Sequence, residues 1–206
     1  MVYEGCDVGL VHDLVGTIYT LMGEEAWTPM RDGREYASLL NACARMGRPS
    51  LGLSICMGDR NEALREAEST LNEYRKKIGE CLEWVREESR IEEMRNIYAL
   101  RARGDIDENI IGVVASILLS TGILKSRKPI VAWARAEEGL IKVSARATEA
   151  MAAEGLDLGD VMMRAAEAFK GRGGGHDIAA GAFLQEEGEK GFIELVDRFV
   201  GEQFKS

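Results

Sequence analysis

The 206-residue sequence has few of the features that mark membrane or secreted proteins. No stretch approaches the roughly 20 consecutive apolar residues that span a bilayer, and the first residues lack the basic and apolar regions of a signal peptide. With 46% hydrophobic and 30% charged residues, the composition excludes a disordered, collagen-like or low-complexity chain. We therefore expect a cytoplasmic globular protein without a membrane partner.

Cysteine and histidine are also scarce. The four cysteines are Cys6, Cys43, Cys56 and Cys81, and the two histidines are His12 and His176. No two cysteines form a C-x-x-C pair, so we expect neither a structural zinc site nor a disulfide framework. Apolar neighbours favour buried or half-buried reduced thiols, and no histidine lies within local reach to activate one for catalysis.

Positive charge is in the minority but unevenly distributed. The formal net charge of -9 argues against a protein that coats nucleic acid through its overall field. Residues 125–176 nevertheless contain nine Lys or Arg against seven acids, a balance of +2, so the rest of the chain carries -11. An anion-binding surface is therefore expected in that segment.

The N-terminal segment, residues 1–58, is predicted to be a helical arm. Glycines interrupt residues 1–33, which we interpret as helical fragments and loops. A helix is predicted over 34–46, where Gly47 ends it, and a second short helix is predicted over 50–57.

A long helix is predicted over residues 59–95. Asp59 followed by Glu62 is typical of a helix N-cap. Apolar residues at alternating intervals of three and four then form one stripe, which consists of Leu64, Ala67, Leu71, Tyr74, Ile78, Cys81 and Val85. Such a helix would be about 55 Å long. We expect it to bridge two bodies or to pack against another helix.

Residues 96–206 are predicted to form an α+β domain. Apolar residues near period two predict strands over 96–103, 129–135, 139–146 and 178–184, with a hairpin turn at 137–139. Helical patterns cover 109–120, 159–170 and 191–204. Strands and helices in this arrangement indicate an α+β fold that follows the helical arm.

A glycine-rich run provides the first candidate site. Gly173, Gly174 and Gly175 give the backbone access to positive φ, so that consecutive amides can converge on a phosphate between Arg172 and His176. Alternatively, the glycines form a tight crossing and His176 is a core histidine. The residues alone leave both interpretations open.

A strand provides the second candidate site. Strand periodicity places Lys142, Ser144 and Arg146 on one face, where Arg146 can bind a phosphate bidentately and Ser144 can donate to it. A solvated strand face with surface charges is the alternative.

These two motifs together resemble a known family. Ser144-Ala145-Arg146 and the later run Gly-Gly-Gly-His-Asp-Ile-Ala-Ala-Gly-Ala at 173–182 resemble the DHHA1 domain, the C-terminal half of the DHH phosphoesterase superfamily. Residues 39–48 resemble the connector of RecJ-type single-strand exonucleases, particularly archaeal RecJ-like proteins. The resemblance covers most of 34–204. It implies a mixed β-sheet flanked by helices, entered through the arm and the long helix.

The resemblance also implies a function for the candidate residues. It implies that the phosphates of a single-stranded DNA or RNA end, or of a short oligonucleotide, are held by Ser144, Arg146, Gly173, Gly174, Gly175 and His176. We add Lys142 and Arg172 as flanking phosphate-binding cations. His176 is the expected catalytic residue, since its imidazole can stabilise charge near the scissile group.

The sequence departs from the family in its metal ligands. DHH enzymes hold two Mn²⁺ or Mg²⁺ ions in an N-terminal domain with an Asp-His-His run, whereas here His12-Asp13 is the one adjacent pair outside the glycine run. We expect no metal or cofactor in this chain and no activity from it alone. It would be the substrate-binding C-terminal portion of a RecJ-like exonuclease, with a DHH domain in the same polypeptide or on another chain.

Two alternatives remain open from the sequence. The first is a non-catalytic module that binds tRNA or other nucleic acid, as DHHA1-like domains do in alanyl-tRNA synthetases. The second is a scaffold whose apolar helix stripe pairs with a replication protein or with a second copy in a homodimer.

Overall fold

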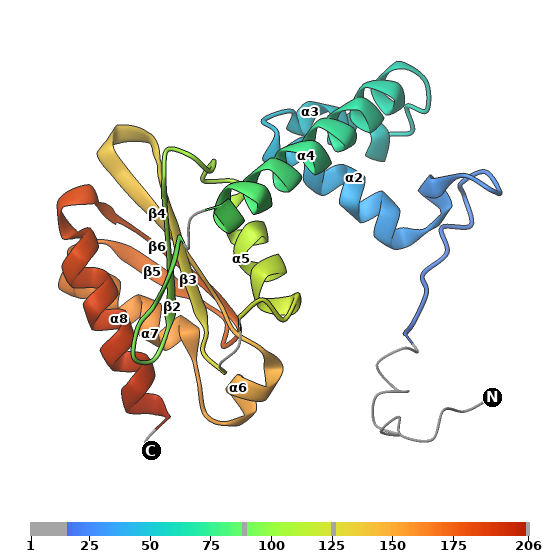
Figure 1. Ribbon diagram of the computed structural model, residues 1–206. Helices are drawn as coiled ribbons and strands as arrows, with labels where there is room; N and C mark the ends of the chain where they lie inside the picture. Colours follow the sequence, from blue (N-terminus) through green and yellow to red (C-terminus); the bar gives the residue numbers. More distant parts are fainter. Residues whose placement is uncertain (1–15, 88–89, 125–126, 205–206) are drawn as a thin grey trace, which may run out of the picture. The chain divides into compact units, whose positions relative to one another are not determined.

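The computed structural model describes residues 16–87, 90–124 and 127–204 (Figure 1). The chain forms two compact units that divide within one helix, since the first ends at Tyr74 and the second begins at Arg75. Cys6, the His12-Asp13 pair and Lys125 lie outside the described residues. Within the described ranges, no helix is both long and apolar enough to cross a membrane.

The first unit is helical, as predicted for the arm. It contains the 3₁₀ turn η1 (Pro29–Arg31), α2 (Gly33–Arg45), α3 (Pro49–Cys56) and the first half of α4 (Glu62–Glu87). Asp32 caps α2, because its carboxylate accepts hydrogen bonds from the backbone N–H groups of Arg34 and Glu35. A small core joins these helices and includes Met30, Leu39, Cys43, Ile55, Ala63 and Ala67. The two short predicted helices are thereby confirmed.

The long helix is shorter than the predicted range 59–95. The predicted N-cap Asp59 is wrong, because α4 starts at Glu62 and ends at Glu87, and the Asp59 carboxylate instead accepts from the N–H of Asn61 at 2.8 Å, ahead of the helix. Its 26 residues correspond to about 39 Å. Of the predicted apolar stripe, Ala67, Tyr74, Cys81 and Val85 are buried, and the other three residues are half-buried. The division of the chain at residues 58 and 95 stays a prediction.

A strand occupies the place of the last predicted helical turns. Ile91–Glu93 form β1, which pairs antiparallel with β2 (Tyr98–Arg103). The Met94 N–H donates to the carbonyl of Ile97 at 3.0 Å and closes the turn. Asp197 of α8 (Glu189–Gln203) fixes this turn, since its carboxylate accepts from the backbone N–H of Asn96 at 2.7 Å. The tertiary contact outweighs the helical propensity of the glutamate-rich segment.

The second unit is built on one six-stranded mixed sheet with the order β1-β2-β3-β4-β6-β5. The remaining strands are β3 (Ile130–Arg135), β4 (Leu140–Arg146), β5 (Arg172–Gly175) and β6 (Ala179–Gln185). β2 and β3 are parallel, and the other neighbours are antiparallel. The predicted α+β class and mixed sheet are therefore confirmed, and the four predicted strands correspond to β2, β3, β4 and β6.

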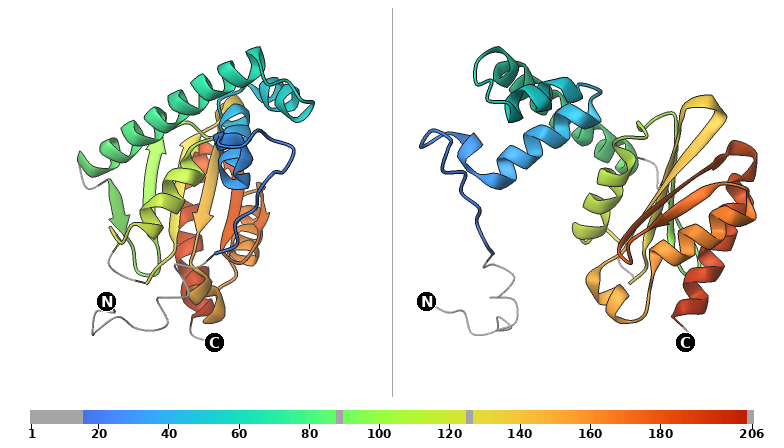
Figure 2. Two further views of the ribbon diagram at one scale, coloured as in Figure 1. Left: turned by 90° about the vertical axis from the view of Figure 1, so that its right-hand side faces the viewer. Right: turned by 180° about the vertical axis from the view of Figure 1, so that it is seen from behind.

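Helices cover both faces of this sheet. α7 (Leu158–Ala168) and α8 lie on one face, and α5 (Ile111–Ser120) lies on the other against β3 and β4 (Figures 1 and 2). The short α6 (Glu149–Ala153) and the 3₁₀ turns η2 (Glu137–Gly139) and η3 (Glu186–Gly188) join these elements. The main core lies between the sheet and the α7–α8 layer and includes Val131, Val143, Val161, Phe192 and Val196.

The three described cysteines are free thiols. Cys43 and Cys81 are buried, as expected, and burial raises the pKa of both. Cys56 is exposed, against the expectation of a buried or half-buried side chain, and it is the last residue of α3. The Tyr36 hydroxyl lies 3.8 Å from its sulfur.

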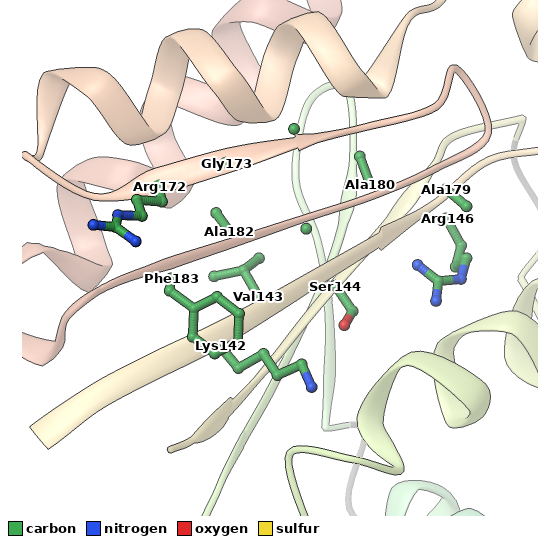
Figure 3. Close-up of a pocket in the computed structure, with 12 residues that line it drawn as sticks. Lys142, Val143, Ser144, Arg146, Arg172, Gly173, Ala179, Ala180, Ala182 and Phe183 are labelled. Atoms are coloured by element: carbon green, nitrogen blue, oxygen red, sulfur yellow. The ribbon is translucent and has the colours of Figure 1, made fainter. Parts of the chain in front are cut away.

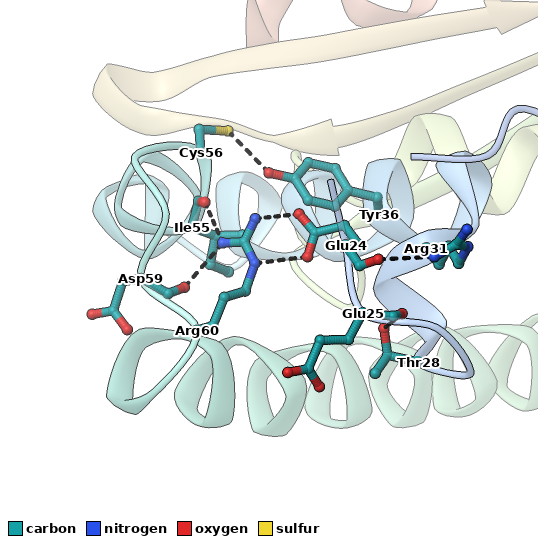
Figure 4. Close-up of polar contacts among 9 residues, drawn as sticks. All are labelled: Glu24, Glu25, Thr28, Arg31, Tyr36, Ile55, Cys56, Asp59 and Arg60. Carbon is teal, nitrogen blue, oxygen red and sulfur yellow. Dashed lines mark hydrogen bonds and ion pairs between the residues drawn. The ribbon is translucent and has the colours of Figure 1, made fainter. Parts of the chain in front are cut away.

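A bidentate ion pair within the first unit ties the segment ahead of α2 to the loop between α3 and α4 (Figure 4). The Arg60 Nε and Nη2 donate to the two carboxylate oxygens of Glu24 at 2.9 and 2.5 Å, and Nη1 donates to the carbonyl of Ile55. The Tyr36 ring centroid lies 5.9 Å from the guanidinium carbon. Both charged side chains are partly buried, with exposed fractions of 32% for Arg60 and 15% for Glu24. These contacts lower the pKa of Glu24 through hydrogen bonding to Arg60.

We expect Glu24→Gln to lower the free energy of unfolding by about 1 kcal/mol at pH 7. The folded-state pKa of Glu24 lies below its ordinary value of 4.5, so the pair stabilises the fold above that value and loses its effect as the pH falls through the lowered pKa. Denaturant unfolding at pH 7 and pH 3 measures the difference. Glu25→Gln, at an exposed neighbour, is the control. An equal loss at both pH values would contradict the ionic contribution.

Candidate functional site

The candidate site lies on one face of strands β4, β6 and β5. Ile141, Val143 and Ala145 of β4 are buried in the core with α7 and α8. Because successive side chains of a strand point to opposite faces, Lys142, Ser144 and Arg146 lie on the other face. The sequence predicted that these three residues lie on one face of the strand.

Strand pairing arranges this face in cross-strand rows. In the first row, Phe183 of β6 lies opposite both Lys142 of β4 and Arg172 of β5. We call it the Phe183 row. It places an aromatic ring between two cations.

The next row consists of small residues. Gly181 of β6 lies opposite Ser144 on one side and Gly174 on the other. In the last row, Arg146 lies opposite Ala179. The site is therefore a floor of small residues between the Phe183 row and Arg146.

These rows line an open pocket of about 480 Å³ (Figure 3). Its twelve lining residues are Lys142, Val143, Ser144, Arg146, Arg172, Gly173, Gly174, Ala179, Ala180, Gly181, Ala182 and Phe183. Three of these residues are basic and none is acidic. Six of the eight residues predicted from the sequence are thus brought together, whereas Gly175 and His176 are not among the lining residues.

Helix α5 holds Arg146 in place. The Arg146 Nε donates to the Ser116 hydroxyl at 3.0 Å, and its Nη1 donates to the carbonyl of Ala145 at 2.8 Å. The Ser116 hydroxyl in turn donates to the carbonyl of Gly112 at 2.9 Å. These bonds fix the plane of the guanidinium beside Ser144, which is only 7% exposed.

Sequence reasoning missed Gly112 and Phe183. A Cβ atom on Gly112 would lie 2.8 Å from Nη2 of Arg146 and 3.2 Å from the hydroxyl of Ser144, so this helix position must be small. The sequence signal for Gly112 was a glycine inside an otherwise apolar helical pattern. For Phe183, the signal was the alternation of β6, which places it on the same face as Gly181.

The predicted loop of converging amides is wrong. Arg172–Gly175 form the edge strand β5, in which successive N–H groups point to opposite sides. Gly173 is required because a Cβ there would collide with the carbonyl oxygen of Met162 in α7, and Gly175 has φ +148 and would place a Cβ 2.5 Å from the Cα of Ala180. The tight crossing is therefore the structural role of the run, and only the Gly174 position has open space beside it.

His176 lies in the turn that joins β5 and β6. Its N–H donates to the carbonyl of Ala179 at 2.9 Å, and the Ala179 N–H donates back at 3.3 Å. His176 is exposed, so the alternative of a core histidine is wrong. Ala179 lies opposite Arg146, which places the turn at the Arg146 end of the pocket.

The described residues do not supply a metal centre. No group of three or more His, Cys, Asp or Glu side chains in ranges 16–87, 90–124 and 127–204 is arranged to hold a metal ion. The residues of this pocket, three of them cationic, do not fit the Mn²⁺ or Mg²⁺ ions of a DHH enzyme.

Comparisons with known proteins agree with this architecture. The uncharacterized protein MJ0831 of Methanocaldococcus jannaschii is 32% identical over 176 residues, which cover 85% of this chain and 37% of that protein. The chain thus spans well under half the length of this relative.

Two solved structures share the fold. RecJ from Thermus thermophilus in complex with Mn²⁺ matches with a TM-score of 0.64 and 20% identity, over 82% of this chain and 24% of that chain. Exonuclease RecJ bound to manganese matches with a TM-score of 0.57 and 20% identity, over 81% of this chain and 40% of that chain.

A family model covers most of the second unit. Residues 95–202, more than half of the chain, match the model described as the DHHA1 domain. The resemblance drawn from Ser144-Ala145-Arg146 and the glycine run is confirmed by this match. The chain belongs to the DHHA1 domain family.

Proposed function

We propose that this chain is the substrate-binding portion of a RecJ-like, metal-dependent exonuclease or phosphoesterase, and that its pocket binds the phosphates of single-stranded nucleic acid. The observation that carries the proposal is the pocket lining, where three basic residues and no acid surround a floor of small residues. In a chain with a net charge of -9, such a lining favours an anionic ligand.

Arg146 and Ser144 are the proposed terminal phosphate contacts. Ser116 and the Ala145 carbonyl already orient the guanidinium, so less conformational entropy is lost when it binds an oxyanion. The Ser144 hydroxyl faces the same pocket and can donate to the phosphate. Gly181 and Gly174 leave room for the ligand to approach the sheet backbone.

Lys142 and Arg172 provide charge at the other end of the pocket. They lie on β4 and β5 in the Phe183 row, four residues along β4 from Arg146. This separation suits a chain with more than one phosphate. Of the glycine run, Gly173 and Gly174 line the pocket and Gly175 does not, so the proposed contribution of the run is limited to the first two.

His176 is proposed to act on the scissile phosphate. Its turn lies at the Arg146 end of the pocket, where the imidazole can stabilise charge that develops during hydrolysis. The two metal ions of a DHH domain, in the same polypeptide or on a partner chain, would supply the activated water. This chain then binds and orients the substrate.

Arg146→Ala is expected to weaken binding of a 5′-phosphorylated oligonucleotide by about 10-fold without unfolding the protein, because a charge-assisted contact is removed. Fluorescence anisotropy measures the affinity, and Arg164→Ala, on α7 at the opposite face of the sheet, is the control. The few cations in the pocket predict a log–log salt slope of about -1 to -3. A steeper slope, or unchanged affinity in Arg146→Ala, would reject the phosphate contact. A clear preference for folded tRNA would favour the tRNA-binding alternative.

Gly112→Ala is expected to weaken the same binding while the fold stays as stable or becomes more stable. The added Cβ must displace the Arg146 guanidinium, whereas alanine favours a helix over glycine by about 1 kcal/mol. Thermal unfolding and anisotropy are measured together. Gly79→Ala in α4, where a Cβ meets nothing within 4 Å, is the matched control. Equal affinities for the two variants would show that the position of the guanidinium is unimportant.

The purified 206-residue chain is expected to bind short oligonucleotides and not to cleave them, with or without Mn²⁺, because the described residues lack a ligand cluster. Release of mononucleotides, followed by chromatography, is the measurement. In an enzyme that also carries a DHH domain, His176→Ala should lower turnover more than binding. Metal-dependent cleavage by the chain alone, lost in His176→Ala, would falsify this division of labour.

A further inference from the structure

The proposed phosphate contacts leave Phe183 without a role. Phe183 is 42% exposed, although Ala182 and Leu184 on either side of it are buried in the core on the other face of β6. Figure 3 shows the ring on the pocket face beside Lys142. What distinguishes Phe183 from other exposed apolar side chains is its place in the lining of the pocket, in one row with Lys142 and Arg172, where a bound ligand would contact its ring.

The surroundings of the ring define the ligand. Lys142 and Arg172 lie directly opposite Phe183 on the two neighbouring strands, and the Lys142 ammonium is 5.6 Å from the ring centroid. The next row, with Gly181 and Gly174, has no bulky side chain beside the ring. A flat group can therefore enter over the glycines and lie against Phe183, with anionic groups next to it.

We infer that Phe183 is a stacking platform for one unpaired base of the strand whose phosphate binds at Arg146. This inference rests on the proposed function. Arg146 and Lys142 are four residues apart on β4, about 13 Å along the strand, so phosphate contact and base contact lie at different ends of one pocket. Lys142 and Arg172 then bind the phosphates that flank the stacked base.

The arrangement determines the class of substrate. A base can present its face to Phe183 only when it is not stacked and paired within a duplex. Every base has such a face, so the contact discriminates single strands from duplexes and tolerates any sequence. Specificity for single strands is thereby a property of this chain's own sheet.

The test uses the full chain and a 5′-phosphorylated tetranucleotide that carries the fluorescent base 2-aminopurine at each position in turn. Stacking on Phe183 quenches this fluorescence at one position. Phe183→Ala should remove the quenching and weaken binding by about 5- to 150-fold, and Phe183→Tyr should retain both. Phe204→Ala, at an exposed phenylalanine at the end of α8, is the matched control. Circular dichroism verifies that each variant folds.

An abasic oligomer with the same phosphates separates this inference from the proposed function. Phe183→Ala should bind the abasic oligomer like the unaltered protein, whereas Arg146→Ala should weaken binding of both oligomers. If Arg146→Ala weakens both and Phe183→Ala leaves quenching and affinity unchanged, the stacking platform is rejected and phosphate binding stands. If Arg146→Ala changes neither, the proposed function itself fails.

Discussion

The alternation of side chains along β4 and β6 is the constraint on which the rest of the site depends. Ile141, Val143, Ala180, Ala182 and Leu184 are buried beneath α7 and α8. This burial fixes the register, because a slip of one residue would move every apolar side chain of the strand out of this core and onto the opposite face. The polar residues of β4 and the exposed Phe183 must then share the opposite face. The hydrophobic core on one side of the sheet therefore positions the pocket on the other.

Two glycine contacts set the thickness of the layers around this sheet. On the core side, Gly173 allows the backbone of α7 to lie directly on β5. On the pocket side, Gly112 allows the Arg146 guanidinium to lie against α5, where Ser116 orients it. At both glycines the neighbouring atoms lie so close that a Cβ would collide with them, as is typical of close-packed protein interiors. The absence of a side chain therefore allows helix packing at Gly173 and positions the candidate site at Gly112.

The local charge of the pocket differs in sign from that of the whole chain. Acidic residues dominate the sequence, yet the pocket lining contains Lys142, Arg146 and Arg172 and no acidic residue. Many of the acids pair with other bases, as Glu24 does with Arg60 in the first unit and Asp160 does with Arg164 on α7. Because surface charges are screened within about 10 Å at ordinary salt, the pocket's own cations govern a ligand held there.

The sequence by itself determined the strands with strict alternation, the amphipathic helices, and the polar face of Lys142, Ser144 and Arg146, because these depend on local periodicity. It did not determine that residues 91–93 leave the helical pattern, which requires pairing with β2 and the contact between Asp197 and Asn96. Nor did it show that the glycine run is an edge strand, since glycine has low strand propensity and only the α7 backbone explains it. The rows that join Phe183 to Arg172 and Arg146 to Ala179 depend on register between distant segments, and only the tertiary structure decides that.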